Sequence, residues 1–173
     1  AFKPLSGDDK AICRQLSQVN TGALRDLVNK RKNQAIGKLD LGLSENSGLS
    51  QLQAVEALPD GTTSEIAAKE AAYRDFLEKA KRSRLAHAAD LLVGAYLLPK
   101  LPHTIDDIPT TSTLYLTLTG EELPSEHQGA LMAAQSKCDE ASVLHWPLAF
   151  PQVFAQGGFD CVLGNPPWDM LQL

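Results

Sequence analysis

The apolar positions near the start of the chain follow a helical period. Between Asp8 and Lys32 they recur at steps of three to five residues, at Ile12, Leu16, Val19, Leu24, Leu27 and Val28. Asp8 and Asp9 stand where the N-terminus of a helix favours acidic side chains. The pattern predicts one helix, or two short helices with a break at Gly22.

A longer helical pattern runs from Thr63 to Leu98. It opens with Thr63-Ser64-Glu65, continues with many Ala, Glu, Lys, Arg and Leu residues, and meets a natural stop at Pro99. One continuous helix here would span about 50 Å, so we expect a break near Ser83. The second half, from Leu85 to Leu98, is apolar nearly all round, which predicts burial against a sizeable neighbour.

Turn-forming residues separate these helices. Residues 37–63 mix glycine, serine and Pro59-Asp60-Gly61 with short apolar pieces, and we interpret them as a loop or insertion. Their glycines do not spell a phosphate loop or a dinucleotide fingerprint. Leu101 to Thr113 is predicted to be a connector in which Asp106 and Asp107 are exposed.

Two further elements follow the connector. Leu114 to Leu118 fits either a short strand or the start of a helix. Pro124-Ser125-Glu126 is expected to begin a helix that runs to about Cys138, with Leu131 and Met132 facing inward. Up to this point the chain is predicted to be mostly helical, and nothing in it carries recognisable chemistry.

The length and the net charge of the chain limit the size of its core and the kind of partner that it can bind. The 173 residues, 43% of them hydrophobic, suffice for one ordinary core, and the formal charge of −5 excludes a global basic field. Contacts with DNA are therefore expected to be local or to lie elsewhere. The most basic spot is Lys30-Arg31-Lys32, which we interpret first as a set of cations at a helix C-terminus and second as a phosphate contact.

Cysteine spacing and hydropathy argue against a disulfide-rich, metal-binding or membrane-spanning protein. Cys13, Cys138 and Cys161 form no CxxC pair, so we predict neither a disulfide framework nor a metal site. The apolar stretch from Ala86 to Leu98 is shorter than the roughly 20 residues that a membrane span needs. No signal peptide opens the chain, and we expect a cytoplasmic protein with no membrane partner.

The C-terminal part of the chain has a different pattern. Large apolar residues and prolines alternate between His145 and Phe154, which predicts an irregular lead-in or a short helix after Pro151. Gly157-Gly158 then predicts a turn. Residues 159–164 form a short apolar run between turn signals, which favours a buried parallel strand. In open α/β sheets ligands bind beyond the carboxyl ends of such strands.

The four residues that follow, Asn165-Pro166-Pro167-Trp168, suit one chemical task. The side-chain oxygen of Asn165 can accept a hydrogen bond from an amino group, and two prolines make a stiff turn whose carbonyl can be aimed at the same group. Trp168 offers a flat face for a planar base. Two acceptors on one exocyclic amine direct its lone pair towards an electrophilic methyl group without a strong base.

Residues 159–168 resemble the catalytic strand and motif of the amino-group DNA methyltransferases, in which Asn, Asp or Ser precedes Pro-Pro and an aromatic residue. The lead-in from His145 to Phe154 is similar to the stretch before the motif in large adenine-specific enzymes of restriction-modification and phage-defence systems. Ala1-Phe2 with Gly7-Asp8-Asp9-Lys10 also resembles the beginning of the helical insertion of those enzymes, although more weakly.

The resemblance implies a fold, a donor and a substrate. The fold class would be α/β, with a mostly helical insertion that leads into a strand of an incomplete Rossmann-like class I methyltransferase sheet. The cofactor would be S-adenosylmethionine and the substrate double-stranded DNA with a flipped adenine. Restriction or defence-system subunits are candidate partners. Residues 1–140 would form the helical region, and residues 141–173 would form part of the catalytic core.

Residue roles also follow from the resemblance. Asn165 and the carbonyl of Pro166 would bind adenine N6, Pro167 would complete the stiff turn, and Trp168 would stack on the base. We interpret His145 as structural or surface-exposed and Trp146 as a packing residue.

The sequence departs from this family in one respect, and two other functions remain as alternatives. The glycine-rich turn and acidic residue with which this family holds its donor are not found, and the family order places them upstream of residue 1. Because these donor-binding features are not found, we expect the chain alone neither to bind the donor tightly nor to catalyse. Both chain ends look like cuts through a longer protein. The alternatives are a methyltransferase acting on a protein glutamine or an RNA base nitrogen, and a non-catalytic helical interaction segment.

Overall fold

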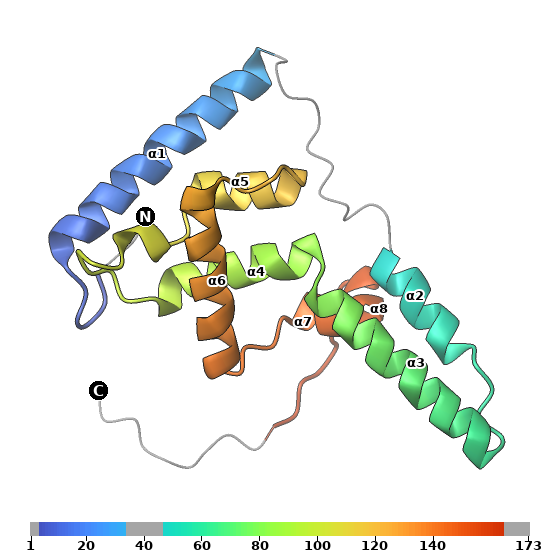
Figure 1. The fold of residues 1–173 in the computed structure, drawn as a ribbon. Helices are drawn as coiled ribbons and strands as arrows, with labels where there is room; N and C mark the ends of the chain where they lie inside the picture. The colour runs from blue at the N-terminus through green and yellow to red at the C-terminus, as the bar shows by residue number, and fades with distance from the viewer. Residues whose placement is uncertain (1–3, 34–46, 165–173) are drawn as a thin grey trace.

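The computed structural model describes residues 4–33 and 47–164, and these ranges are built from helices (Figure 1). In chain order the elements are α1 (Lys10–Lys32), α2 (Ser47–Glu56), α3 (Thr63–Lys81), α4 (Arg84–Leu97), the 3₁₀ helix η1 (Ile105–Asp107), α5 (Thr111–Thr119), α6 (Ser125–Glu140), α7 (Trp146–Ala149) and α8 (Pro151–Ala155). Helices α4, α5 and α6 form the centre, and α1 lies against α5. The α2–α3 hairpin extends to one side, with α8 against α2.

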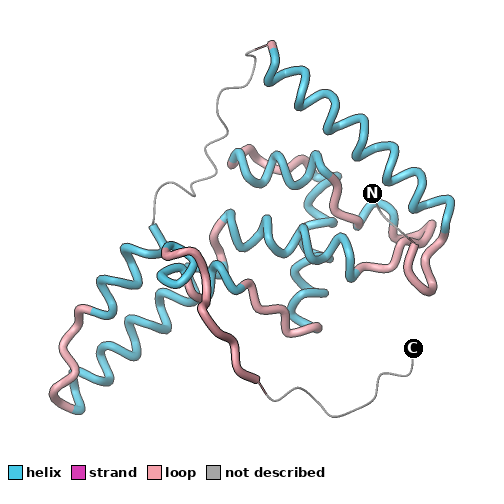
Figure 2. Tube along the Cα trace, turned by 180° about the vertical axis from the view of Figure 1, so that it is seen from behind, coloured by secondary structure: helices cyan, strands magenta, loops and turns pink. Residues whose placement is uncertain are grey.

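The predicted α/β fold class is wrong for the described residues. Figure 2 shows helices and loops in residues 4–33 and 47–164 and no strand. Residues 159–164, predicted to be a buried strand, are irregular, and the side chains of Val162 and Leu163 are 65% and 93% exposed. A strand is stabilised by a ladder of backbone hydrogen bonds to a neighbour, and the described chain supplies no such neighbour.

The centre of the fold is the close crossing of α4 and α6. A Cβ atom added to Gly94 would lie 2.6 Å from Ala134 Cβ and 2.8 Å from Ala134 Cα. The buried residues of α6, Ala130, Ala134 and Cys138, are all small, and they face Leu91 and its neighbours on α4. Small side chains therefore let the two backbones approach each other. Helix α4 is buried on one side only, since Leu92 and Tyr96 are 52% and 68% exposed, so the burial predicted for a helix that is apolar nearly all round is confirmed in part.

Several predicted helix boundaries are confirmed. Asp9 caps α1 by accepting hydrogen bonds from the backbone N–H groups of Ala11 and Ile12. The expected break near Ser83 separates α3 from α4, and the Ser83 hydroxyl accepts from Ala86 N. Leu114 to Leu118 lies within a helix, which decides between the two predicted alternatives. Asp106 and Asp107 are exposed, as expected.

Helix α1 continues through Gly22 without a break, which decides for one helix over two short ones. Other expectations are wrong. Helix α2 lies inside the stretch predicted as a loop, of which residues 37–46 lie outside the described residues. Met132 is 70% exposed, because it lies on the side of α6 opposite its contact with α4. Helical periodicity indicates which positions share a face, but it does not say which face meets a partner.

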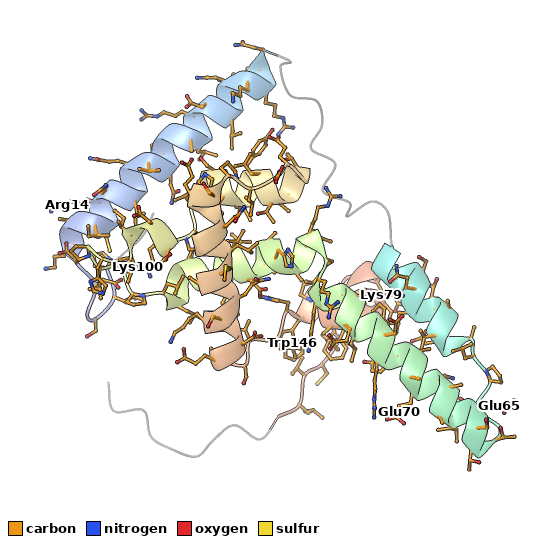
Figure 3. The ribbon with its side chains drawn as sticks, in the orientation of Figure 1. Arg14, Glu65, Glu70, Lys79, Lys100 and Trp146 are labelled. Atoms are coloured by element: carbon orange, nitrogen blue, oxygen red, sulfur yellow. The ribbon has the colours of Figure 1, made fainter. Side chains whose placement is uncertain are left out.

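The N-terminal segment is tied to the end of α4. Asp8 accepts a hydrogen bond from Lys100 N at 3.0 Å, and Asp9 N donates to Lys100 O at 2.9 Å. The Lys100 side chain, which Figure 3 labels, is buried and donates to Tyr96 O. These bonds fix the start of α1 on the central helices.

Candidate active site

The predicted site residues Asn165, Pro166, Pro167 and Trp168 lie outside the described residues, which end at Gly164. Their roles stay predictions. The structure does describe the segment that leads to them, from the end of α6 at Glu140 to Gly164. This lead-in shows which parts of the fold position the chain just before the motif.

Two short helices begin at the prolines of the lead-in. Pro147 lies in the first turn of α7 and Pro151 begins α8. Proline suits these positions because its ring presets a helical φ and its missing N–H would have no partner in the first turn. The helix predicted after Pro151 is therefore confirmed. Helix α7 is a helical turn within the segment that was predicted to be irregular.

Three aromatic rings surround Phe159. Its ring lies edge-on to Trp146 and Phe150, with centroids 5.5 Å away in each case, and to Phe154 at 6.0 Å. Edge-to-face pairs of this kind contribute about 0.5–1.5 kcal/mol each beyond burial. Trp146, labelled in Figure 3, therefore packs within this aromatic cluster, in agreement with its interpretation as a packing residue. The cluster holds Phe159 six positions before Asn165.

The turn between α8 and Phe159 depends on two glycines. Gly157 N donates to Phe154 O and Gly158 N donates to Val153 O, which is the bonding pattern of a Schellman motif. Both glycines have positive φ, +105° and +118°, which residues with a Cβ rarely adopt. The predicted Gly157-Gly158 turn is thus present, and it directs the chain back onto the aromatic cluster.

A histidine–aspartate pair fixes the start of the lead-in. His145 Nε2 donates to Asp90 Oδ1 of α4 at 2.7 Å, and both side chains are more than four-fifths buried. The Cys138 thiol of α6 points to the backbone carbonyl of Asp90 at 3.6 Å. Burial, with Asp90 next in importance, raises the pKa of Cys138 to about 11. The pair leaves no local signal in the sequence, because 55 residues separate its members.

A hollow lies beside the lead-in, between the α2–α3 hairpin and α8. Its walls are largely apolar, from Leu52, Val55, Ile66, Tyr73 and Phe150. Of its rim carboxylates, Asp60 pairs with Lys69 at 2.9 Å and Glu70 pairs with Arg74 at 2.6 Å. Glu56 and Gln152 also line the hollow, but an amino-acid and ribose donor needs several convergent polar partners, which the largely apolar walls of this hollow do not supply.

The described ranges contain neither a metal site nor a membrane-spanning helix. Residues 4–33 and 47–164 contain no group of three or more His, Cys, Asp or Glu side chains that could hold a metal ion. In the same ranges, no helix has both the length and the apolar character that crossing a membrane demands.

Comparison with protein families shows to which family the chain belongs. A model of the Eco57I restriction-modification methylase family matches residues 80–172, which is more than half of the chain. The chain belongs to this family. The match begins at the end of α3, covers α4 to α8 and the lead-in, and continues across Asn165 to Trp168. Neither the curated proteins nor the solved structures that were searched give a match.

Membership supports a methyltransferase of the restriction-modification type that acts on DNA. The helical region from α4 to α6 and the lead-in are therefore parts of one family domain rather than unrelated units. The match itself carries no statement about the base or the atom that is methylated.

Proposed function

We propose that this protein transfers a methyl group from S-adenosylmethionine to the N6 amine of adenine in double-stranded DNA, within a restriction-modification or phage-defence system. The observation that carries the proposal is that the family match extends through Asn165-Pro166-Pro167-Trp168. The residue types of this motif are those that an exocyclic amine requires.

Each motif residue has a proposed role. The side-chain oxygen of Asn165 and the carbonyl of Pro166 accept the two N6 hydrogens, so that the nitrogen lone pair is released from the ring and turned to one side. Pro167 stiffens the turn. Trp168 stacks on the base after it leaves the duplex, a contact worth about 1–3 kcal/mol by comparison with single-strand binders.

When bound, the donor supplies an electrophilic methyl group. The roles proposed for this chain's motif residues lie on the substrate side of the reaction. Its residues bind the amine, orient the lone pair and hold the base.

A helical region favours DNA over the alternative substrates. Methyltransferases that act on a protein glutamine or an RNA base with a similar motif are small, and we expect them to lack a long helical region before it. Here helices occupy most of the described ranges from Lys10 to Ala155. A non-catalytic interaction segment is disfavoured because the family match continues across the motif.

The test is methyl transfer by the full-length protein. With tritiated donor and adenine-containing duplex DNA, wild type should label the DNA, and labelled N6-methyladenine should be recovered after digestion. Asn165→Ala should abolish labelling while donor binding, measured by calorimetry, is retained. Asn33→Ala, at the exposed end of α1, provides the matched control and should leave labelling intact.

Two results would contradict the proposal. Turnover of Asn165→Ala at the wild-type rate would remove the motif from the reaction. Labelling of RNA or of a glutamine-containing peptide in place of DNA would assign the same motif to the alternative substrates.

A further inference from the structure

Positive charge is concentrated in α1. Six of the 16 Lys and Arg residues of the chain lie in this 23-residue helix, which contains a single acidic residue, Asp26. The chain as a whole carries a formal charge of −5. The helix is therefore a local basic element on an acidic protein.

Four of these six cations lie along one face of the helix. At 3.6 residues per turn, seven polar residues of α1 fall within an arc of about 100°. We call them the basic stripe: Lys10, Arg14, Gln18, Thr21, Arg25, Asn29 and Lys32. Four of them, Arg14, Gln18, Thr21 and Arg25, line one shallow concavity together with Ser17 and Gly22. The buried residues Cys13 and Leu16 lie on the opposite side of the helix.

The stripe faces solvent. The side chains of Lys10, Arg14, Arg25 and Lys32 are exposed, and Figure 3 shows Arg14 on the outer side of α1. In both views the C-terminal end of α1 lies apart from the other helices (Figures 1 and 2). Gly22, at the edge of the stripe, has nothing within 4 Å of the position where a Cβ would stand.

Within the described ranges no carboxylate forms an ion pair with the cations of α1. Helix α3 provides the contrast, because its Arg74 pairs with Glu70 and its Lys79 pairs with Asp75. The positive charge of α3 is thus balanced on the helix itself, whereas that of α1 is available to a partner.

Helix stability does not explain the stripe. Cations in the last turn, such as Lys32, are favoured by the helix dipole. Lys10 stands at the opposite end, where the dipole disfavours a cation, and the first turn contains no acidic residue. Arg14 and Arg25 also lie outside the last turn. A partner of opposite charge accounts for their placement.

We propose that the basic stripe contacts the phosphate backbone of duplex DNA. From Lys10 to Lys32 it extends about 33 Å, close to the roughly 34 Å of one B-DNA turn. Arginine, lysine, threonine and amide side chains are the usual partners of phosphate oxygens. The contact adds affinity without sequence information, and it rests on the proposed function in that DNA is the substrate.

Charge removal tests this contact in the full-length protein. The double variant Arg14→Gln/Arg25→Gln removes two charges and keeps good helix formers. Arg74→Gln/Lys79→Gln removes two charges from the balanced pairs of α3 and is the matched control. Arg14→Lys/Arg25→Lys keeps the charge. Binding of a fluorescent duplex is followed by anisotropy over a range of salt concentrations, and thermal unfolding checks that each variant is folded.

The expected result is a change in salt dependence. The slope of log Kobs against log salt should fall in magnitude by about two for the Gln pair on α1, and by the same amount for cognate and unrelated duplexes. The Lys pair and the α3 control should keep the wild-type slope. A merely structural role for Arg14 and Arg25 would lower the unfolding temperature and leave the slope unchanged.

The outcomes separate the two proposals. Suppose that wild type methylates DNA but the Arg14→Gln/Arg25→Gln variant keeps the wild-type slope and affinity. The basic stripe is then not a DNA contact, and the proposed function stands. If wild type neither binds nor methylates any duplex, the proposed function fails, and the DNA contact fails with it.

Discussion

His145 Nε2 lies 2.7 Å from Asp90 Oδ1, so the segment that leads to the predicted motif is fixed on the central helix α4. The bond is placed where the chain leaves α6 and enters α7. From there the aromatic rings of α7 and α8 hold Phe159, and Phe159 precedes Asn165 by six residues. From this series of contacts we predict a positioning role for His145.

Loss of this bond should lower the rate of methyl transfer. We expect His145→Ala to reduce kcat by about tenfold or more, because small displacements of a reacting group are costly to catalysis. His145→Gln, which keeps a side-chain N–H donor, should recover part of the rate. Steady-state kinetics on the full-length protein provide the measurement.

The control for His145 is another histidine. His103 is exposed in the connector before η1, and His103→Ala should keep the wild-type kcat. Equal kcat values for His145→Ala and His103→Ala would show that the bond to Asp90 does not position the motif.

The same substitution at two helical glycines should change stability in opposite directions. Gly94→Ala places a Cβ 2.8 Å from the backbone Cα of Ala134, which side-chain rotation cannot relieve. We expect a loss of about 1–3 kcal/mol in the free energy of unfolding from overpacking. Gly22→Ala meets open space and should gain up to about 1 kcal/mol from helix propensity.

Chemical denaturation of the two variants measures this difference. A stable Gly94→Ala protein would mean that α4 and α6 can separate without cost, and that their close crossing does not determine the fold.

Much of the helical fold could be predicted from local signals. Asp9 and Ser83 lie at helix starts as N-caps, which is a short-range interaction, and Pro124 precedes α6 without a capping hydrogen bond. The run 159–164 was misjudged for the opposite reason. A short apolar run between glycines fits a strand, but a strand depends on a neighbour that periodicity does not reveal. The His145–Asp90 pair likewise depends on packing between distant segments.

The candidate site could be predicted only as far as its chemistry. Residue type and order single out Asn165 and Trp168, and their roles stay predictions; the match over residues 80–172 shows the family. The basic stripe on α1 carries a weaker sequence signal, because only helix geometry brings Arg14 and Arg25 onto one face.

Thiol reactivity should distinguish the three cysteines. Cys161 is exposed, whereas Cys13 and Cys138 are buried. Burial raises the pKa of both buried thiols, that of Cys138 to about 11, so little of the reactive thiolate forms at neutral pH. Brief treatment of the folded protein with iodoacetamide should label Cys161 first, as peptide mass spectrometry would show. Labelling of Cys138 at the rate of Cys161 would indicate that α4 and α6 open readily.

Asp8 should give the protein a stability that is lost in acid. Its pKa lies below the ordinary value of 3.8 because Lys100 N–H donates to the carboxylate; burial acts in the opposite direction, and Leu5 N–H and the Lys100 ammonium lower the pKa further. A lowered pKa means that the folded state favours the ionised form. The contribution is therefore complete well above pH 3.8 and disappears as the pH falls through the folded-state pKa.

The variant Asp8→Asn tests this pH dependence. At neutral pH it should lose about 1–3 kcal/mol in the free energy of unfolding, since the amide replaces a charged acceptor of two backbone bonds. The difference from wild type should shrink as the pH is lowered below 3.8, because only wild type titrates there. Asp26→Asn on the exposed side of α1 reports the general effect of removing one negative charge. A difference that grows in acid would mean that Asp8 is not held as a carboxylate by Lys100, and that the N-terminal segment is attached by other contacts.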